Sequence, residues 1–252
     1  MRTVSWFSCG AASAVATKLA LKDNPDTVIA YCEVKEEHPD NKRFLKDCQE
    51  WFGKEIIILG NDEYKRSIYE VFWRRKYMSG VAGAPCTGLL KKEMREIFQE
   101  PDDIHVFGYT CEEEDRLNRF IDANNEINVI TPLIDKGLSK SDVLAMIENA
   151  GIELPEMYKL GYKNNNCMGC VKAASVAYWK KIQIDFPKMF NRAAGMELMT
   201  GCKLCKYTVD GEEFRVSLLN LPKHIKPMDD TVDIQCGIFC HMAEEDLIKT
   251  GE

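Results

Sequence analysis

Residues 3–21 read TVSWFSCGAASAVATKLAL, and this stretch holds a strand, a turn and a helix in direct succession. Residues 4–7 are apolar enough for a buried strand, and residues 11–21 have the Ala- and Leu-rich composition of a helix. The turn between them, residues 8–13, consists only of small residues. Small side chains let the backbone approach a ligand closely, and a turn into a helix directs N–H groups and the positive end of the helix dipole at an anion. We therefore expect a phosphate at this turn, although tight packing between strand and helix also favours small residues.

The pattern of the opening stretch continues through the first half of the chain. Further apolar strands are predicted at residues 26–34, 55–60 and 103–110, and helices at residues 40–53, 62–79 and 88–99. Strands that alternate with helices form a parallel sheet with helices on both faces. The predicted fold class is therefore α/β and Rossmann-like, with the small-residue turn after the first strand.

The pattern changes at residue 139. A helix is predicted at residues 139–151, with Ser139 as its cap, and helical sequence continues over residues 176–199. The chain beyond residue 200 is cysteine-bearing and rich in turns. We predict an α/β domain over residues 1–138 and a helical, cysteine-bearing region over residues 139–252. The two parts can also form a single domain.

The composition bounds the class of protein. The chain has 252 residues, 45% of them hydrophobic, and a formal net charge of −7, which argues against broad, non-specific binding of nucleic acid. No apolar run approaches the roughly 20 residues of a membrane helix, and no signal peptide is recognisable, so we expect a cytoplasmic protein that does not bind membranes. Eleven cysteines in such a protein indicate thiols, metal ligands or redox chemistry rather than a disulfide scaffold.

Cysteine spacing predicts a metal centre. Two C-x-x-C motifs each direct two thiolates at one metal ion, and a third pair is spaced by three residues. Cys167 and Cys170 can share a metal with Cys236 and Cys240 or with Cys202 and Cys205. Four thiolates suit zinc as well as a four-iron iron–sulfur cluster. The three pairs are Cys167 and Cys170, Cys202 and Cys205, and Cys236 and Cys240.

Several stretches resemble one family. The turn SCGAAS is similar to the SGGxDS loop of the PP-loop enzymes, the adenine nucleotide α-hydrolase superfamily, and the chain more narrowly resembles its phosphoadenosine phosphosulfate reductase family. The other stretches that carry this resemblance occur in the order of the family: EEHPDNKRF, PCTGLLKKEMR, GYTCEEEDRLNR and GYKNNNCMGC.

The sequence also departs from the family pattern. Cys9 stands where the loop usually has Gly, and Ala12 stands where ATP pyrophosphatases have the Asp that is expected to help with Mg²⁺ and phosphate. The absence of this Asp weakens the case for ATP cleavage, and sulfonucleotide reductases lack it as well. Reductases carry a Cys-Cys pair before the LK helix, but this chain has Cys86-Thr87. A cluster bound in their manner would use Cys86 with Cys167 and Cys170, and would lose one ligand.

The resemblance implies a set of site residues. Lys91 and Arg119 are expected to act on the phosphate or sulfate, and Cys236, in QCGIF, is similar to the nucleophile of the ECGLH motif, although Phe239 replaces its His. Metal ligands favoured by the resemblance are Cys167, Cys170, Cys236 and Cys240. The residues expected to bind the nucleotide are Ser8, Cys9, Gly10, Ala11, Ala12, Ser13, Glu33, Cys86 and Arg116.

The resemblance also implies a function. We expect an enzyme of sulfur metabolism that binds an adenine nucleotide (ATP, APS or PAPS) within residues 1–138 and acts at its α-phosphate or sulfate with a thiolate metal centre. One alternative is ATP-dependent sulfur transfer to tRNA or a nucleobase, and another is a non-catalytic nucleotide-binding module with structural zinc. Expected partners are the nucleotide, tRNA or a thiol reductant protein, and further copies of the chain in a homo-oligomer.

Overall fold

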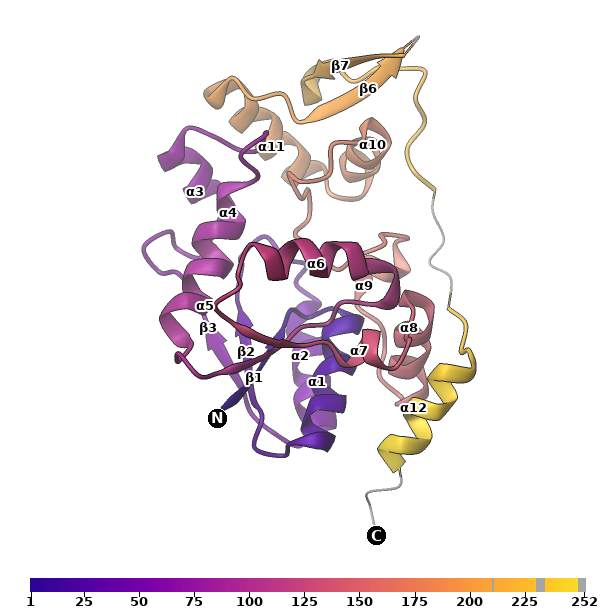
Figure 1. The fold of residues 1–252 in the computed structure, drawn as a ribbon. Helices are drawn as coiled ribbons and strands as arrows, with labels where there is room; N and C mark the ends of the chain where they lie inside the picture. Colours follow the sequence, from indigo (N-terminus) through magenta and orange to yellow (C-terminus); the bar gives the residue numbers. More distant parts are fainter. Residues whose placement is uncertain (210, 230–233, 249–252) are drawn as a thin grey trace.

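The centre of the protein is a parallel sheet of five strands (Figure 1). The computed structural model describes residues 1–209, 211–229 and 234–248. The strands lie in the order β3-β2-β1-β4-β5, and every neighbouring pair is parallel. Their bounds are β1 Thr3–Phe7, β2 Val28–Cys32, β3 Ile56–Leu59, β4 Ile104–Val106 and β5 Asn128–Ile130. The predicted α/β fold with a parallel sheet is confirmed.

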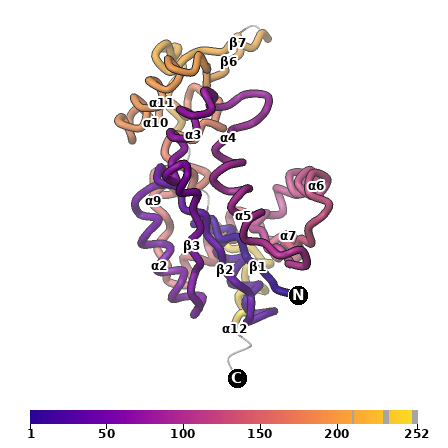
Figure 2. The backbone as a smooth tube through the Cα atoms, turned by 90° about the vertical axis from the view of Figure 1, so that its left-hand side faces the viewer, coloured from indigo at the N-terminus to yellow at the C-terminus, as the bar shows by residue number. Residues whose placement is uncertain are grey.

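Helices cover both faces of the sheet, and Figure 2 shows α2 and α6 on opposite sides of it. On one face Phe7 meets Phe44 and Phe52 of α2, and Ser5 shares a hydrogen bond of 2.8 Å with Thr17 of α1. On the other face Trp6 of β1 packs against Phe98 at the end of α5, and Phe107, directly after β4, packs against Phe120 of α6. The helices are α1 Ala11–Asp23, α2 Asn41–Phe52, α3 Ile68–Arg75, α5 Glu93–Phe98 and α6 Glu114–Asp122.

A continuous helical segment precedes β4. It begins as α4 Pro85–Thr87, passes through a π-helical turn, η1 Gly88–Lys92, and continues as α5. Turns of this kind are rare in proteins overall, and many of those that occur lie at functional sites. The segment carries Cys86 near its start and Lys91 in the π-helical turn.

The C-terminal half packs onto the sheet domain in two places. Helix α8 lies against α1, and α12 lies against α8, so both belong to the apolar core around α1. Helix α11 contacts α3, and together with α10 and a β-hairpin it builds a second core at the top of Figure 1. The division at residue 138 stays a prediction. The elements are α7 Pro132–Asp135, α8 Lys140–Asn149, α9 Glu156–Lys159, α10 Val176–Asp185, α11 Pro187–Thr200, β6 Cys205–Val209, β7 Glu212–Val216 and α12 Ile238–Ile248, with 3₁₀ turns η2 Cys111–Glu113 and η3 Leu218–Asn220.

Several elements differ from the prediction. The helix expected over residues 62–79 begins only at Ile68, because Lys65 and Arg66 have φ angles of 50° and 55°, outside the helical range. Strand β5 and the β6–β7 hairpin were not predicted, since β5 has three residues and the hairpin alternates weakly between polar and apolar residues. No helix in the described part of the chain has the length and apolar character needed to cross a membrane.

Candidate functional site at the carboxyl edge of the sheet

The order of the strands locates a site. From β1 the chain continues to β2 and β3 on one side of β1, and then returns to form β4 and β5 on its other side. The direction in which strands are added therefore reverses between β1 and β4. Ligands of open α/β sheets bind at such a point, outside the carboxyl ends of the strands. Residues 8–13, here named the phosphate loop, follow β1 at this edge and lead into α1.

The phosphate loop is held by its own hydroxyls. The Ser8 amide donates a hydrogen bond of 3.0 Å to Ser13 Oγ, and Ser13 Oγ donates one of 2.9 Å to the Gly10 carbonyl. Ser8 itself is exposed, whereas Ser13 is buried. The first amides of a helix have no partner within the helix and carry the positive end of its dipole. The arrangement therefore offers an anion a fixed group of donors.

The end of β4 touches the phosphate loop. A Cβ atom built on Gly108 would lie 2.7 Å from the backbone N and Cα of Ser13, which is closer than such atoms approach in proteins. Only glycine, which has no side chain, allows the backbone after β4 to approach the start of α1 this closely. Gly108 thus fixes the spacing between the two loops that flank the switch point.

Cys9 is a structural residue of the loop. Its φ angle is 56°, a left-handed conformation that favours the glycine found at this position in the family pattern. Its side chain is fully buried, and its Sγ lies 3.7 Å from the Asn41 carbonyl. Burial, with the charge of Glu37 next in effect, raises the pKa of the Cys9 thiol well above its usual range. The thiol therefore stays protonated and is a poor nucleophile.

A buried network of side chains supports the loop from below. Asn165 Nδ2 donates to the Cys9 carbonyl and, at 2.8 Å, to Asn41 Oδ1. Asn41 Nδ2 in turn donates at 3.0 Å to Glu37 Oε2, which also accepts a hydrogen bond of 2.6 Å from Tyr31. The network joins the NNNC stretch to the phosphate loop. The sequence pattern did not identify these residues as part of the site. Within the network, Asn165 Oδ1 is buried and has no hydrogen-bond partner.

Lys91 reaches the same network. Its Nζ lies 3.1 Å from Glu37 Oε1, and its side chain is 42% exposed against 4% for Glu37. Burial alone lowers the pKa of Lys91, but the charge of the Glu37 carboxylate and its hydrogen bond outweigh this effect and hold the pKa above its ordinary value. Lys91 is thus a permanent cation with a partly exposed head. Lys92, by comparison, is exposed and lies 3.5 Å from Glu96 of α5.

Three other predicted site residues, two nucleotide ligands and the catalytic candidate Arg119, are engaged elsewhere. Arg116 pairs with Glu113 and lies over the ring of Tyr109, and both Arg116 and Arg119 are exposed on α6. Glu33 Oε2 accepts a hydrogen bond of 2.6 Å from Arg66. The structure does not bring these side chains to the phosphate loop, and their roles stay predictions.

Two residues from the C-terminal half reach the phosphate loop instead. Tyr158 Oη lies 3.4 Å from the Ala11 amide at the start of α1, and Lys140 Nζ lies 3.1 Å from the same oxygen. Sequence analysis missed this pair, because nothing local in α8 or α9 indicates that their side chains meet α1.

The cysteines do not assemble as predicted. Cys236 and Cys240 are bonded to each other; they are four residues apart and meet at the start of α12. They pack in the core around α1, whereas Cys167 packs in the core around α10 and α11. The four-cysteine set of Cys167, Cys170, Cys236 and Cys240 is therefore not brought together.

Cys86 and Cys167 lie near Lys91, and Cys170 lies near both of these thiols. Burial raises the pKa of Cys86 to about 11, with Cys170 adding to the shift, and raises the pKa of Cys167 well above its usual range, with both other thiols contributing. No three cysteine sulfurs within residues 1–209, 211–229 and 234–248 lie within 4.8 Å of one another. Cys202 Sγ lies 3.3 Å from the Ser79 carbonyl, and Cys205 is buried.

Comparison with known proteins identifies one family. Residues 2–175 match the family model of the phosphoadenosine phosphosulfate reductase domain. The matched range is more than half of the chain and contains the phosphate loop, Lys91 and the CMGC motif. No curated protein matches the chain at a significant level.

Proposed function

Because the chain belongs to the phosphoadenosine phosphosulfate reductase domain family, we propose that it binds an adenine nucleotide across the carboxyl edge of its sheet and acts at the α-phosphate or sulfate. The observation that carries this proposal is the phosphate loop at the switch point, with Gly108 on one side and Lys91 on the other. The loop amides and the Ser8 hydroxyl would bind the phosphate oxygens. Lys91 would neutralise the charge next to the sulfate.

The reaction we propose is reduction of an adenylyl sulfate. A thiolate attacks the sulfate sulfur, an S–S bond forms, the bridging S–O bond breaks, and the adenosine phosphate leaves with that electron pair. A dithiol reductant then releases sulfite and is oxidised to its disulfide. Our candidate nucleophile is Cys236, whose bond to Cys240 must first be reduced by the same class of reductant. Ala12, at the position of the Asp used in ATP cleavage, supports reduction over ATP-dependent sulfur transfer.

A thiolate metal centre near Lys91 belongs to the same proposal. Cys86, Cys167 and Cys170 fit zinc or an iron–sulfur cluster in ligand type, because both bind cysteine thiolates, and metal binding displaces the thiol protons. A bound zinc ion or cluster would offset part of the negative charge of these thiolates and hold them together. Closed sites of this type need four ligands, and Cys236 and Cys240 do not supply the fourth.

The test uses the reduced full chain under anaerobic conditions with APS and PAPS in turn. Sulfite and the matching adenosine phosphate should form in equal amounts, and Cys236→Ser should abolish both products while Cys48→Ser, at a buried thiol of α2, should retain them. Nucleotide binding without any sulfite would exclude reduction. The tRNA partner, the thiol reductant protein and the homo-oligomer stay predictions.

A further inference from the structure

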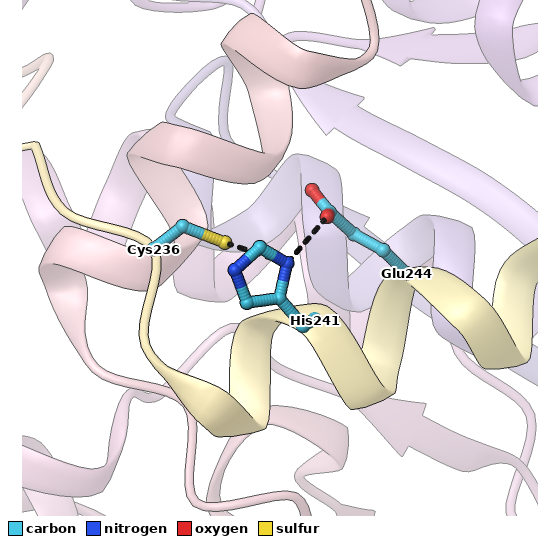
Figure 3. A group of neighbouring side chains, drawn as sticks. All are labelled: Cys236, His241 and Glu244. Carbon is cyan, nitrogen blue, oxygen red and sulfur yellow. Dashed lines mark hydrogen bonds and ion pairs between the residues drawn. The ribbon is translucent and has the colours of Figure 1, made fainter.

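The C-terminal segment carries a second group of metal-binding side chains, away from the phosphate loop. Cys236 Sγ, a ring nitrogen of His241 and a carboxylate oxygen of Glu244 all lie within 4.8 Å of one another (Figure 3). His241 Nδ1 is 3.8 Å from Cys236 Sγ and 3.9 Å from Glu244 Oε2. Within the residues that the structure describes, this is the one group of three such donors.

These distances approach those of a tetrahedral zinc site. Zinc binds sulfur at about 2.3 Å and nitrogen or oxygen at about 2.0 to 2.1 Å, which places neighbouring ligand atoms about 3.3 to 3.6 Å apart. His241 Nδ1 would need to move about 0.2 to 0.6 Å closer to each of the other two donors, and Cys236 Sγ and the Glu244 carboxylate lie within 4.8 Å of each other. A thiolate, an imidazole and a carboxylate are also the ligand types that zinc takes, and the fourth position remains for water.

The group is held on a docked helix. The backbone of the segment is fixed to α8 by the Gly237 amide, which donates a hydrogen bond of 2.8 Å to Asp142 Oδ1, and by the Gln235 amide, which donates one of 2.7 Å to Ser141 Oγ. A Cβ on Gly237 would approach Asp142 Oδ1 to 3.0 Å, so the close docking relies on glycine. Cys240 and Ala243 are buried on the inner side of α12.

A further side chain orients two of the donors. Asn149, at the end of α8, directs its Nδ2 at Glu244 Oε1 at 2.8 Å and at Cys236 Sγ at 4.0 Å. Hydrogen bonds of this kind fix the orientation of metal ligands. The His241 side chain is 65% exposed, which leaves solvent access for an ion.

We propose that Cys236, His241 and Glu244 form a zinc site that can bind the ion only when the Cys236–Cys240 disulfide is reduced. In the disulfide the Cys236 sulfur is bonded to Cys240 and is not a thiolate ligand. A dithiol reductant supplies two electrons and two protons, is oxidised to its own disulfide, and leaves two thiols. Zinc then binds Cys236 as the thiolate, and one proton is released. The site rests on these contacts alone and not on the proposed reductase activity.

The test compares two variants that remove the same disulfide. Full-length wild type, Cys236→Ser and Cys240→Ser are stripped of metal, treated with zinc with and without prior dithiothreitol, desalted anaerobically, and assayed for zinc per chain. Wild type should gain one equivalent on reduction. Cys240→Ser should hold that equivalent without reductant, and Cys236→Ser should lack it under both conditions.

The thiols near Lys91 are the same in all three proteins, so their zinc cancels in the comparison. Equal zinc contents of Cys236→Ser and Cys240→Ser would overturn the proposal. In reduced protein, His241→Ala should lose the equivalent, and Asn149→Ala should weaken zinc binding ~10- to 100-fold because the ligands lose their orientation. In Cys240→Ser, Co²⁺ should give a stronger thiolate charge-transfer band than in Cys236→Ser, because only Cys240→Ser keeps the Cys236 ligand, and identical spectra of these two variants would equally contradict the site.

Discussion

Lys91 Nζ lies 3.1 Å from Glu37 Oε1, so the cation of the π-helical turn is tied to the same carboxylate that supports the phosphate loop through Asn41 and Asn165. The pair joins two features that are far apart in the sequence. It also keeps Lys91 protonated at neutral pH, because the Glu37 charge outweighs burial and raises the lysine pKa. A substrate anion would meet a charge that is already in position.

Replacing Lys91 should therefore weaken nucleotide binding. A hydrogen bond to a charged group contributes about 1.5 to 3 kcal/mol, so Lys91→Met should raise the Kd for APS or PAPS ~10- to 100-fold. Lys92→Met is the matched control, since Lys92 is exposed and pairs with Glu96, and its Kd should stay near that of wild type. Titration calorimetry measures both. Equal effects of the two substitutions would exclude a specific role for Lys91.

The contact between Gly108 and the phosphate loop predicts a second effect. Gly108→Ala would force a Cβ against the Ser13 backbone, so we expect a loss of about 1 to 3 kcal/mol in the free energy of unfolding and a loss of nucleotide binding. Gly195→Ala in α11 has no atom within 4 Å of the new Cβ and should stabilise the protein by about 0.5 to 1 kcal/mol. Chemical denaturation measures both. A Gly108→Ala protein as stable as wild type would contradict the close approach.

The NNN run offers a test of the buried network. Asn165 is buried and bonds to the Cys9 carbonyl, whereas its neighbours Asn164 and Asn166 are exposed. Asn165→Ala should lower the free energy of unfolding by about 1 to 3 kcal/mol, because Asn41 and the Cys9 carbonyl lose a buried partner. Asn164→Ala should stay within about 0.5 kcal/mol of wild type. If both substitutions behave alike, the network does not support the loop.

The ion pair between Asp103 and Arg2 predicts a pH dependence of stability. Asp103 is buried before β4, and its carboxylate accepts hydrogen bonds of 2.9 and 2.6 Å from Arg2, the main cause that holds its pKa below the ordinary value. The stability from this pair is present above the unfolded-state pKa of about 3.9 and is lost as the pH falls through the lower folded-state pKa. Asp103→Asn should cost about 1.5 to 3 kcal/mol at pH 7.

The pH dependence provides the check on that assignment. The difference between wild type and Asp103→Asn should shrink as the pH falls below about 4, because wild type then loses the same charge. Unfolding curves at several pH values measure this difference. A difference that stays constant down to pH 2 would show that the Asn substitution acts through packing and not through the charge of Asp103.

The sequence predicted the fold better than the site. Apolar strands alternating with helices indicated the parallel sheet, and the small residues of the loop indicated its position before α1. Strand β5 escaped prediction because its three residues owe their conformation to pairing with β4. The supporting contacts escaped because they join distant residues: Asn165 and Cys9 are 156 positions apart, and Tyr158 and Ala11 are 147 apart. The cysteine motifs gave ligand types but not which pairs meet, since that depends on how α12 docks onto α8.

The most direct test of the account is a calorimetric titration of the reduced wild-type chain with ATP, APS and PAPS. We predict saturable binding of APS or PAPS at one site per chain, which weakens in Lys91→Met and is retained in Lys92→Met. Absence of binding by all three nucleotides, or binding that Lys91→Met leaves unchanged, would contradict a nucleotide site at the carboxyl edge of this sheet.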